Sequence, residues 1–201
     1  MQNKNLRMIL EIALFAAIAM ILDLIIPSTH SVKITVKMLP IVFLALRWGV
    51  LPGMAGGLLW GILQIILGEA YILSAPQVFI EYILAFSCIG LAGLFHKKMQ
   101  RALSRKEPVK SDLAMIATMA LITGSFIRYI WHMIAGYVFW SENIESVKAA
   151  IINTISVNGL AFITETVTSL ILLWIMIPSF KQLLRNPASM PELRAEENAN
   201  A

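Results

Sequence analysis

Long apolar runs, separated by short polar or proline-containing stretches, make up most of the chain. They predict six helices, over residues 8–26, 38–48, 52–67, 76–95, 113–139 and 149–177. Because a helix needs roughly 20 apolar residues to cross a bilayer, six crossings would use most of the 201 residues. We therefore expect an all-α integral membrane protein, with six transmembrane helices in one compact bundle over residues 1–180 and a polar tail over 181–201.

The apolar run over 38–67 has to be divided to fit this pattern. As a single helix it would be about 45 Å long, which is too long for one ordinary crossing. Arg47-Trp48-Gly49 and Pro52-Gly53 near its middle are typical of a turn. The first half, 38–48, is shorter than a bilayer requires, so a re-entrant segment packed within the protein is the alternative to a full crossing.

The charge pattern favours two crossings. Basic residues collect at the cytoplasmic ends of membrane helices, and the densest basic stretch here is 96–110. Placing that stretch, both termini and the turn at Arg47 in the cytoplasm puts 12 of the 16 lysines and arginines inside, which only the split allows. The tail over 181–201 is then cytoplasmic.

The first apolar run continues to Ile26, so we interpret it as an uncleaved span and not as a signal peptide.

The composition excludes several classes of protein. With 58% hydrophobic residues, 14% charged residues and a mean hydropathy of +0.76, the chain is not an ordinary soluble domain. Since the basic residues flank apolar segments, we expect contact with the lipid bilayer and not with nucleic acid. Cys88 is the single cysteine and the three histidines are dispersed in depth, so no metal site is expected. The sequence also lacks a phosphate-binding G-x-x-x-x-G-K-[ST] loop, so the chain itself is not expected to use ATP.

Small residues recur at a spacing of four on two of the predicted helices. They are Ala13 and Ala17 on the first helix, and Gly53, Gly57 and Gly61 on the third. This spacing lets helix backbones approach closely in a membrane. We expect the glycines to serve packing inside the bundle.

Ionisable residues inside a membrane helix cost roughly 2.5 to 3.5 kcal/mol each, so each calls for a partner or a purpose. Those inside the predicted spans are Asp23, Glu81, Arg128, His132 and Glu165. With the orientation above, Glu81, His132 and Asn158 fall at one level in the outer half of the bundle. The residues predicted around them are Tyr71, Tyr82, Trp140 and Asn153.

Arg128, His132, Gly136 and Trp140 recur every four residues, so they lie along one face of the fifth predicted helix. This pattern is typical of a pocket wall, in which Gly136 lets a ligand approach the backbone and Trp140 stacks on a ring or attracts a cation. Glu81 would hydrogen-bond an amino-substituted ring or balance a positive charge. We expect Arg128 to pair with Glu165 or with Glu81. The structural alternatives are that Trp140 only marks the membrane interface and that His132 only joins two helices.

Several of these segments occur together, and in the same order, in a known family. They are Lys37-Met38-Leu39-Pro40-Ile41, Leu46-Arg47-Trp48-Gly49, Gly56-Gly57-Leu58-Leu59-Trp60-Gly61, Gly68-Glu69-Ala70-Tyr71, Ile80-Glu81-Tyr82 and Arg128-Tyr129-x-x-His132-x-x-x-Gly136-x-x-x-Trp140. The chain resembles the thiamine-specific S component of energy-coupling factor (ECF) transporters, over nearly its whole length.

The resemblance implies a six-helix, multi-pass protein of a bacterial plasma membrane that binds thiamine with high affinity near its outer face. It implies a subunit of an importer and not an enzyme, with no cofactor of its own. A shared transmembrane partner and two ATPase subunits would supply the energy from ATP. By the same resemblance, the Ala13/Ala17 pair would dock on the transmembrane partner.

The resemblance also implies roles for single residues. Trp140 would stack on the ligand, Glu81 would bond its aminopyrimidine, and His132 and Asn158 would complete the site. Tyr71, Tyr82 and Gly136 match further contact positions. In two places the chain departs from the family pattern: residues 27–38 contain no tryptophan, and Asn153 stands where a tyrosine is usual. These departures leave another vitamin or a thiamine precursor open as the ligand, and a membrane enzyme using Glu81 and His132 as acid and base is the less favoured alternative.

Overall fold

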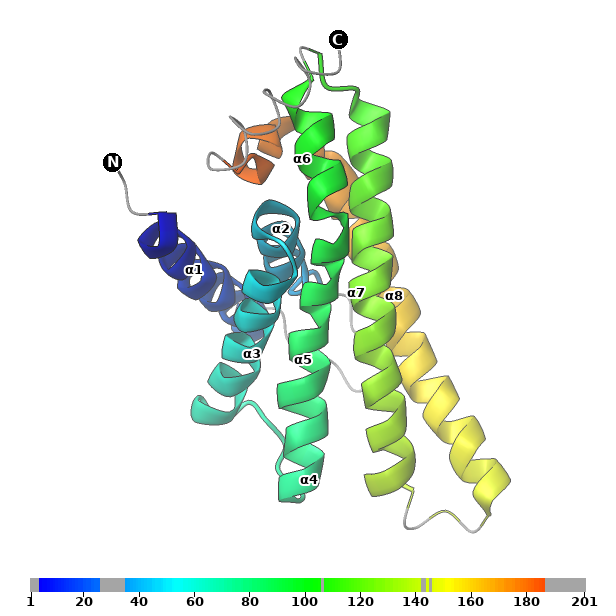
Figure 1. Cartoon of the computed structure of the whole chain (residues 1–201). Coiled ribbons are helices and arrows are strands. Elements are labelled where there is room, and N and C mark those ends of the chain that lie inside the picture. Colours follow the sequence, from blue (N-terminus) through cyan, green and yellow to red (C-terminus); the bar gives the residue numbers. More distant parts are fainter. Residues whose placement is uncertain (1–3, 26–34, 106, 142–143, 145, 187–201) are drawn as a thin grey trace.

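The chain forms six helical rods in a computed structural model that describes residues 4–25, 35–105, 107–141, 144 and 146–186 (Figure 1). The rods are α1 (Lys4–Ile25), α2 (Leu39–Trp48), α3 (Val50–Ile66), a continuous rod from Ala75 to Ser104, α7 (Lys110–Phe139) and α8 (Val147–Leu184). The described residues contain no strand, so the all-α prediction is confirmed. Four of the rods are long and apolar enough to cross a membrane, while α2 and α3 are shorter.

The rod from Ala75 to Ser104 is less regular than its sequence predicts. It consists of α4 (Ala75–Val78), a π-helical segment η1 (Phe79–Leu84), α5 (Ala85–Cys88), a 3₁₀ segment η2 (Ile89–Phe95) and α6 (His96–Ser104). The rod starts at Ser74, whose hydroxyl accepts a hydrogen bond from the Gln77 backbone N–H at 3.3 Å, as an N-cap does. Glu81 lies in the π-helical segment, a conformation that is rare and frequently found at functional sites.

The predicted division of the 38–67 run is confirmed at Gly49. This residue separates α2 from α3 and has φ +96°, a left-handed conformation that favours glycine. All ten residues of α2 are buried. At about 15 Å, α2 spans roughly half of the hydrocarbon core. Its neighbours therefore enclose it, and it does not depend on contact with lipid.

Polar contacts tie together the end of the bundle that is rich in basic residues. Arg47 is 3% exposed, and its guanidinium donates to Glu11 at 3.0 Å and to the Leu183 carbonyl. The Trp48 indole N–H also donates to Glu11, at 2.6 Å. Arg47 is thus a structural residue as well as a marker of topology, which its place in a predicted turn does not reveal.

The same end gathers the start of α1, the Gly49 turn, α6 and the end of α8, as the charge pattern requires (Figure 1). Helix α8 runs to Leu184, beyond the predicted limit of 177. After it, the Asn186 backbone N–H donates to Gln100 at 2.8 Å. That this end faces the cytoplasm stays a prediction, and the part of the predicted tail beyond 186 lies outside the described residues.

The glycines of α3 serve close packing, as expected. A Cβ on Gly57 would overlap the Phe86 carbonyl, and one on Gly61 would overlap the Tyr82 carbonyl. Trp60, between them, is fully buried with its ring centroid 4.5 Å from that of Phe86. Helix α3 therefore lies directly against the segment that carries Glu81 and Tyr82.

Replacing Gly61 by alanine should destabilise the bundle, because the added methyl meets backbone that cannot rotate away. Overpacking of this kind costs about 1–3 kcal/mol, which corresponds to a fall of about 2–12 °C in Tm for a chain of this size. Thermal unfolding of the detergent-solubilised protein would measure it. Gly159→Ala is the matched control, since a Cβ there meets no atom of the described residues within 4 Å. Equal Tm values for the two variants would contradict the assigned packing.

Candidate functional site

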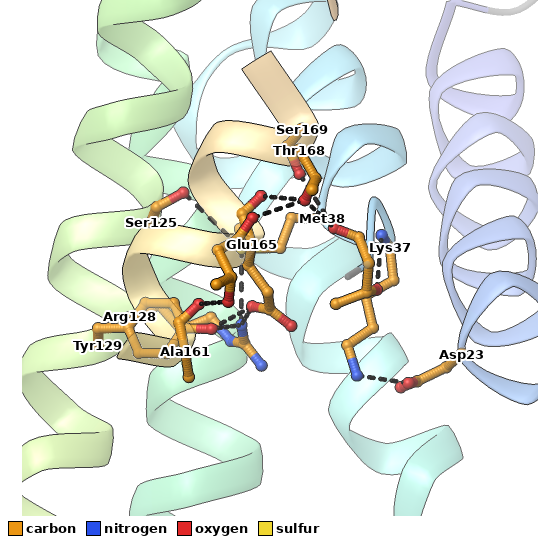
Figure 2. A network of polar contacts seen from close by, with 12 residues as sticks. Asp23, Lys37, Met38, Ser125, Arg128, Tyr129, Ala161, Glu165, Thr168 and Ser169 are labelled. Carbon is orange, nitrogen blue, oxygen red and sulfur yellow. Dashed lines mark hydrogen bonds and ion pairs between the residues drawn. The ribbon is translucent and has the colours of Figure 1, made fainter. Parts of the chain in front are cut away.

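A buried ion pair joins α7 to α8 near the middle of the bundle (Figure 2). An Nη of Arg128 lies 2.8 Å from a carboxylate oxygen of Glu165, and the two residues are 5% and 1% exposed. The Tyr129 hydroxyl donates to the same carboxylate. The Arg128 guanidinium also lies 4.9 Å from the Phe86 ring centroid, within cation–π range. Of the two partners expected for Arg128, the structure selects Glu165 and leaves Glu81 without this cation.

A second polar network holds the segment that leads into α2. Lys37, two residues before α2, is 8% exposed and lies 2.5 Å from the Asp23 carboxylate. Gln64 donates to the other oxygen of Asp23. On the opposite side, the Thr168 hydroxyl donates to the Thr35 carbonyl at 3.1 Å (Figure 2). The segment is therefore fixed between α1 and α8, and Asp23 has its expected partner.

Four predicted site residues come together at the end of the bundle that lies opposite Arg47 and Glu11. The Trp140 indole N–H donates to Glu81 Oε1 at 3.1 Å. The Tyr71 and Trp140 ring centroids are 5.1 Å apart, tilted by 51°. The Tyr82 hydroxyl accepts from the Tyr71 backbone N–H at 2.8 Å. We call these residues, with Gln77, the Glu81 cluster.

Gln77 belongs to the cluster although no sequence feature singled it out. Its side chain is fully buried beneath the 71–73 loop. Its Nε2 donates to the Tyr71 carbonyl at 3.1 Å and to Glu81, and its Oε1 accepts from the Leu73 backbone N–H at 3.1 Å. The signal that would have found it is its position four residues before Glu81 on one helix, where side chains meet.

The other predicted site residues of α7 and α8 lie apart from the cluster contacts. His132 is about 12 Å from Trp140 along the helix axis, given the 1.5 Å rise per residue. Its ring lies 5.8 Å from Tyr129 and 6.4 Å from Phe86, centroid to centroid. His132 therefore lies next to the two rings that also contact the Arg128 guanidinium, at the inner end of the candidate site.

Gly136 and Asn158 mark a close contact between α7 and α8. A Cβ on Gly136 would lie 2.8 Å from Nδ2 of Asn158, so the missing side chain makes room for that amide. The same Nδ2 donates to the Thr154 carbonyl of its own helix at 3.1 Å. Asn153 is exposed and none of these contacts includes it. Contact of Gly136, Asn153 and Asn158 with a ligand stays a prediction.

A cleft of about 740 Å³ opens at the same end of the bundle. Its lining includes Leu73, Ser74 and Tyr137, but none of Glu81, His132, Trp140 or Asn158. The Tyr71 ring contacts the Trp140 ring, whose indole N–H is bonded to Glu81. A planar ligand ring needs about 3.5 Å on each face, so binding between these two rings requires them to separate.

The cluster offers one carboxylate surrounded by aromatic faces. Within the described part of the chain, Glu81 accepts hydrogen bonds from Trp140 and Gln77 and has no cationic partner. An aromatic face attracts cations, and an ionised carboxylate accepts hydrogen bonds from amino groups. The site is therefore suited to a flat, amino-substituted ligand that carries positive charge.

The protein is small and helical, with a polar and aromatic cluster at one end of the bundle and buried ion pairs near the middle. These are the features of a membrane transport protein. The sequence model of the thiamine transporter protein family (Thia_YuaJ) matches residues 9–185. The chain belongs to this family. It is a multi-pass protein of a bacterial plasma membrane and not an enzyme, as predicted.

Individual relatives agree with this assignment. The thiamine transporter ThiT of Lacticaseibacillus paracasei is 34% identical over 187 residues, covering 90% of this chain and 92% of the relative. ThiT of Bacillus subtilis is 29% identical over 92% of this chain and 97% of its own length. A solved structure of ThiT from Listeria monocytogenes superposes with a TM-score of 0.83 at 35% identity, covering 91% of this chain and all of that one.

Proposed function

We propose that this protein binds thiamine through the Glu81 cluster, as the substrate-binding S component of an ECF-type importer. The observation that supports the proposal best is the Glu81 carboxylate, which lies next to the Trp140 ring and has two hydrogen-bond donors but no cationic partner among the described residues. Thiamine carries a permanent positive charge and an aminopyrimidine, and this site complements both groups. His132 and Asn158 complete the pocket on its inner side, and Tyr71, Tyr82, Gly136 and Asn153 line it.

Thiamine binding should quench tryptophan fluorescence, because a ring bound on Trp140 displaces Tyr71 and ends the indole bond to Glu81. Fluorescence titration of the purified protein with micromolar thiamine would measure the quenching. Trp140→Phe should lose most of the signal. Trp174→Phe is the matched control and should keep it, since Trp174 donates to Thr118 at 2.8 Å, away from the cluster. Unchanged emission of the wild-type protein would contradict the proposal.

Another vitamin or a thiamine precursor remains the second candidate ligand, because Asn153 replaces the usual tyrosine and no tryptophan occurs in 27–38. The described residues do not include 26–34, where that loop runs. Competition of labelled thiamine with its isolated pyrimidine moiety and with riboflavin would separate the two candidates. Stronger competition by either competitor than by thiamine would favour the second.

The energy for transport comes, in this proposal, from a shared ECF transmembrane subunit and two ATPase subunits. Helix α1 offers a face for the transmembrane subunit. Phe15, Ala16 and Ala19 are buried against α2 and α3, whereas Ala13 is exposed and Ala17 half-buried beside it. This arrangement suits docking, because small residues let a partner helix approach closely.

Replacing Ala13 by leucine should abolish thiamine uptake while leaving thiamine binding intact. The exposed position accommodates the larger side chain in the isolated protein, but the added atoms separate α1 from a partner helix. Uptake would be measured in proteoliposomes that contain the ATPases and the transmembrane subunit, and binding would be measured in detergent. Wild-type uptake by the variant would contradict docking through Ala13.

A further inference from the structure

The Glu81 carboxylate is held in place by a side chain that does not itself face the site. Gln77 lies one turn before Glu81, is fully buried, and forms three side-chain hydrogen bonds within a few residues. Its amide oxygen and nitrogen are both hydrogen-bonded, as buried polar groups in folded proteins are.

The two backbone partners of Gln77 fix the orientation of its amide. The Leu73 N–H can only donate, so the Gln77 oxygen faces it at 3.1 Å. The Tyr71 carbonyl can only accept, so the Gln77 nitrogen faces that group, also at 3.1 Å. The nitrogen has one hydrogen left, and it is directed at Oε2 of Glu81. The amide cannot turn over without losing both backbone bonds.

We propose that Gln77 is a positioning residue for substrate recognition. It donates to Oε2 of Glu81 and thereby aims the carboxylate at the amino group of the ligand. It also ties the loop that carries Tyr71 to the same carboxylate. The inference rests on the proposed function, because it concerns how Glu81 distinguishes an aminopyrimidine from a ring without the amino group.

The test compares thiamine with oxythiamine, in which an oxo group replaces the amino group of the pyrimidine. Both ligands carry the same thiazolium charge, so the ratio of their dissociation constants reports recognition of the amino-substituted edge of the pyrimidine. The wild-type protein should prefer thiamine. Gln77→Met keeps the length of the side chain but removes the donor, and should weaken thiamine binding about tenfold or more while changing oxythiamine binding much less.

Gln77→Glu provides a second variant. It keeps an oxygen for the Leu73 N–H and, at a pH where both carboxyl groups are ionised, has no hydrogen for Glu81. Its added charge acts on both cationic ligands and therefore cancels in the ratio. The preference for thiamine should fall here too. Gln182→Met, at an exposed position near the other end of the bundle, should keep the wild-type ratio. Thermal unfolding of each variant would establish that it is folded.

The outcomes are distinguishable. A wild-type protein that binds neither ligand contradicts the proposed function. A wild-type preference that survives in Gln77→Met and Gln77→Glu contradicts the positioning role. Equal weakening of both ligands, or failure of both variants to fold, would assign Gln77 to stability alone and overturn the inference.

Discussion

Replacing Arg128 by methionine should destabilise the protein more than any other single change considered. Glu165 would then be a carboxylate at 1% exposure with a hydrogen bond from Tyr129 but no cation paired with it among the described residues. Breaking a buried ion pair in this way costs about 3–5 kcal/mol, which corresponds to about 6–20 °C in Tm for a chain of this length. Thermal unfolding in detergent would measure the loss.

Two controls separate the buried charge from side-chain volume. Arg105→Met breaks an ion pair of similar length, 2.6 Å to Asp112, whose side chains are 52% and 37% exposed. Exposed pairs contribute only about 0.2–1 kcal/mol, so this variant should lose little. The double variant Arg128→Met/Glu165→Leu removes both buried charges and should recover most of the stability. If Arg128→Met is no less stable than Arg105→Met, the pair does not hold α7 to α8.

The fold could be predicted from the sequence largely because apolar run length is a direct consequence of bilayer thickness. The break at Gly49 was also visible, since a glycine-containing turn divides a run too long for one span. The π-helical segment at Glu81 was not, because its residues are as apolar as those of the regular helix around it. This segment packs closely on α3 at Gly61, and the hydropathy of one helix does not show which other helix it meets.

The sequence predicts which residues belong to the candidate site better than it predicts the contacts between them. A spacing of four identified the stripe on α7, but it did not show that Gly136 accommodates the Asn158 amide. Depth along the helices placed Glu81 near Trp140, and the structure joins them by a hydrogen bond. Depth alone also placed His132 at that level, whereas the structure packs its ring against Tyr129 and Phe86. Residue type and depth thus indicate which residues are candidates for the site, and the packing of the helices determines which of these side chains contact one another.

The largest expected effect on binding comes from replacing Glu81 by glutamine. With the ligand bound, the two carboxylate oxygens accept from Gln77 and from the ligand amino group that replaces the Trp140 indole, whereas the amide has one oxygen and would turn its NH₂ toward one of these donors. The variant also loses the negative charge that faces the cationic ligand. A charge-assisted hydrogen bond contributes about 1.5–3 kcal/mol, so the dissociation constant for thiamine should rise on the order of 10- to 150-fold. Calorimetric titration of the purified variant would measure it.

Glu69→Gln is the matched control, because Glu69 is exposed in the loop before Tyr71 and undergoes the same loss of charge. A surface substitution typically changes a free energy by no more than about 0.5 kcal/mol, so this variant should bind thiamine within about threefold of wild type. Its small effect should also disappear at high salt, since exposed charges are screened. An equal loss in both variants would mean that the ligand senses only the general charge of this end of the bundle. Wild-type affinity in Glu81→Gln would remove Glu81 from the site, whereas a large, salt-resistant loss in that variant alone would locate recognition at its carboxylate.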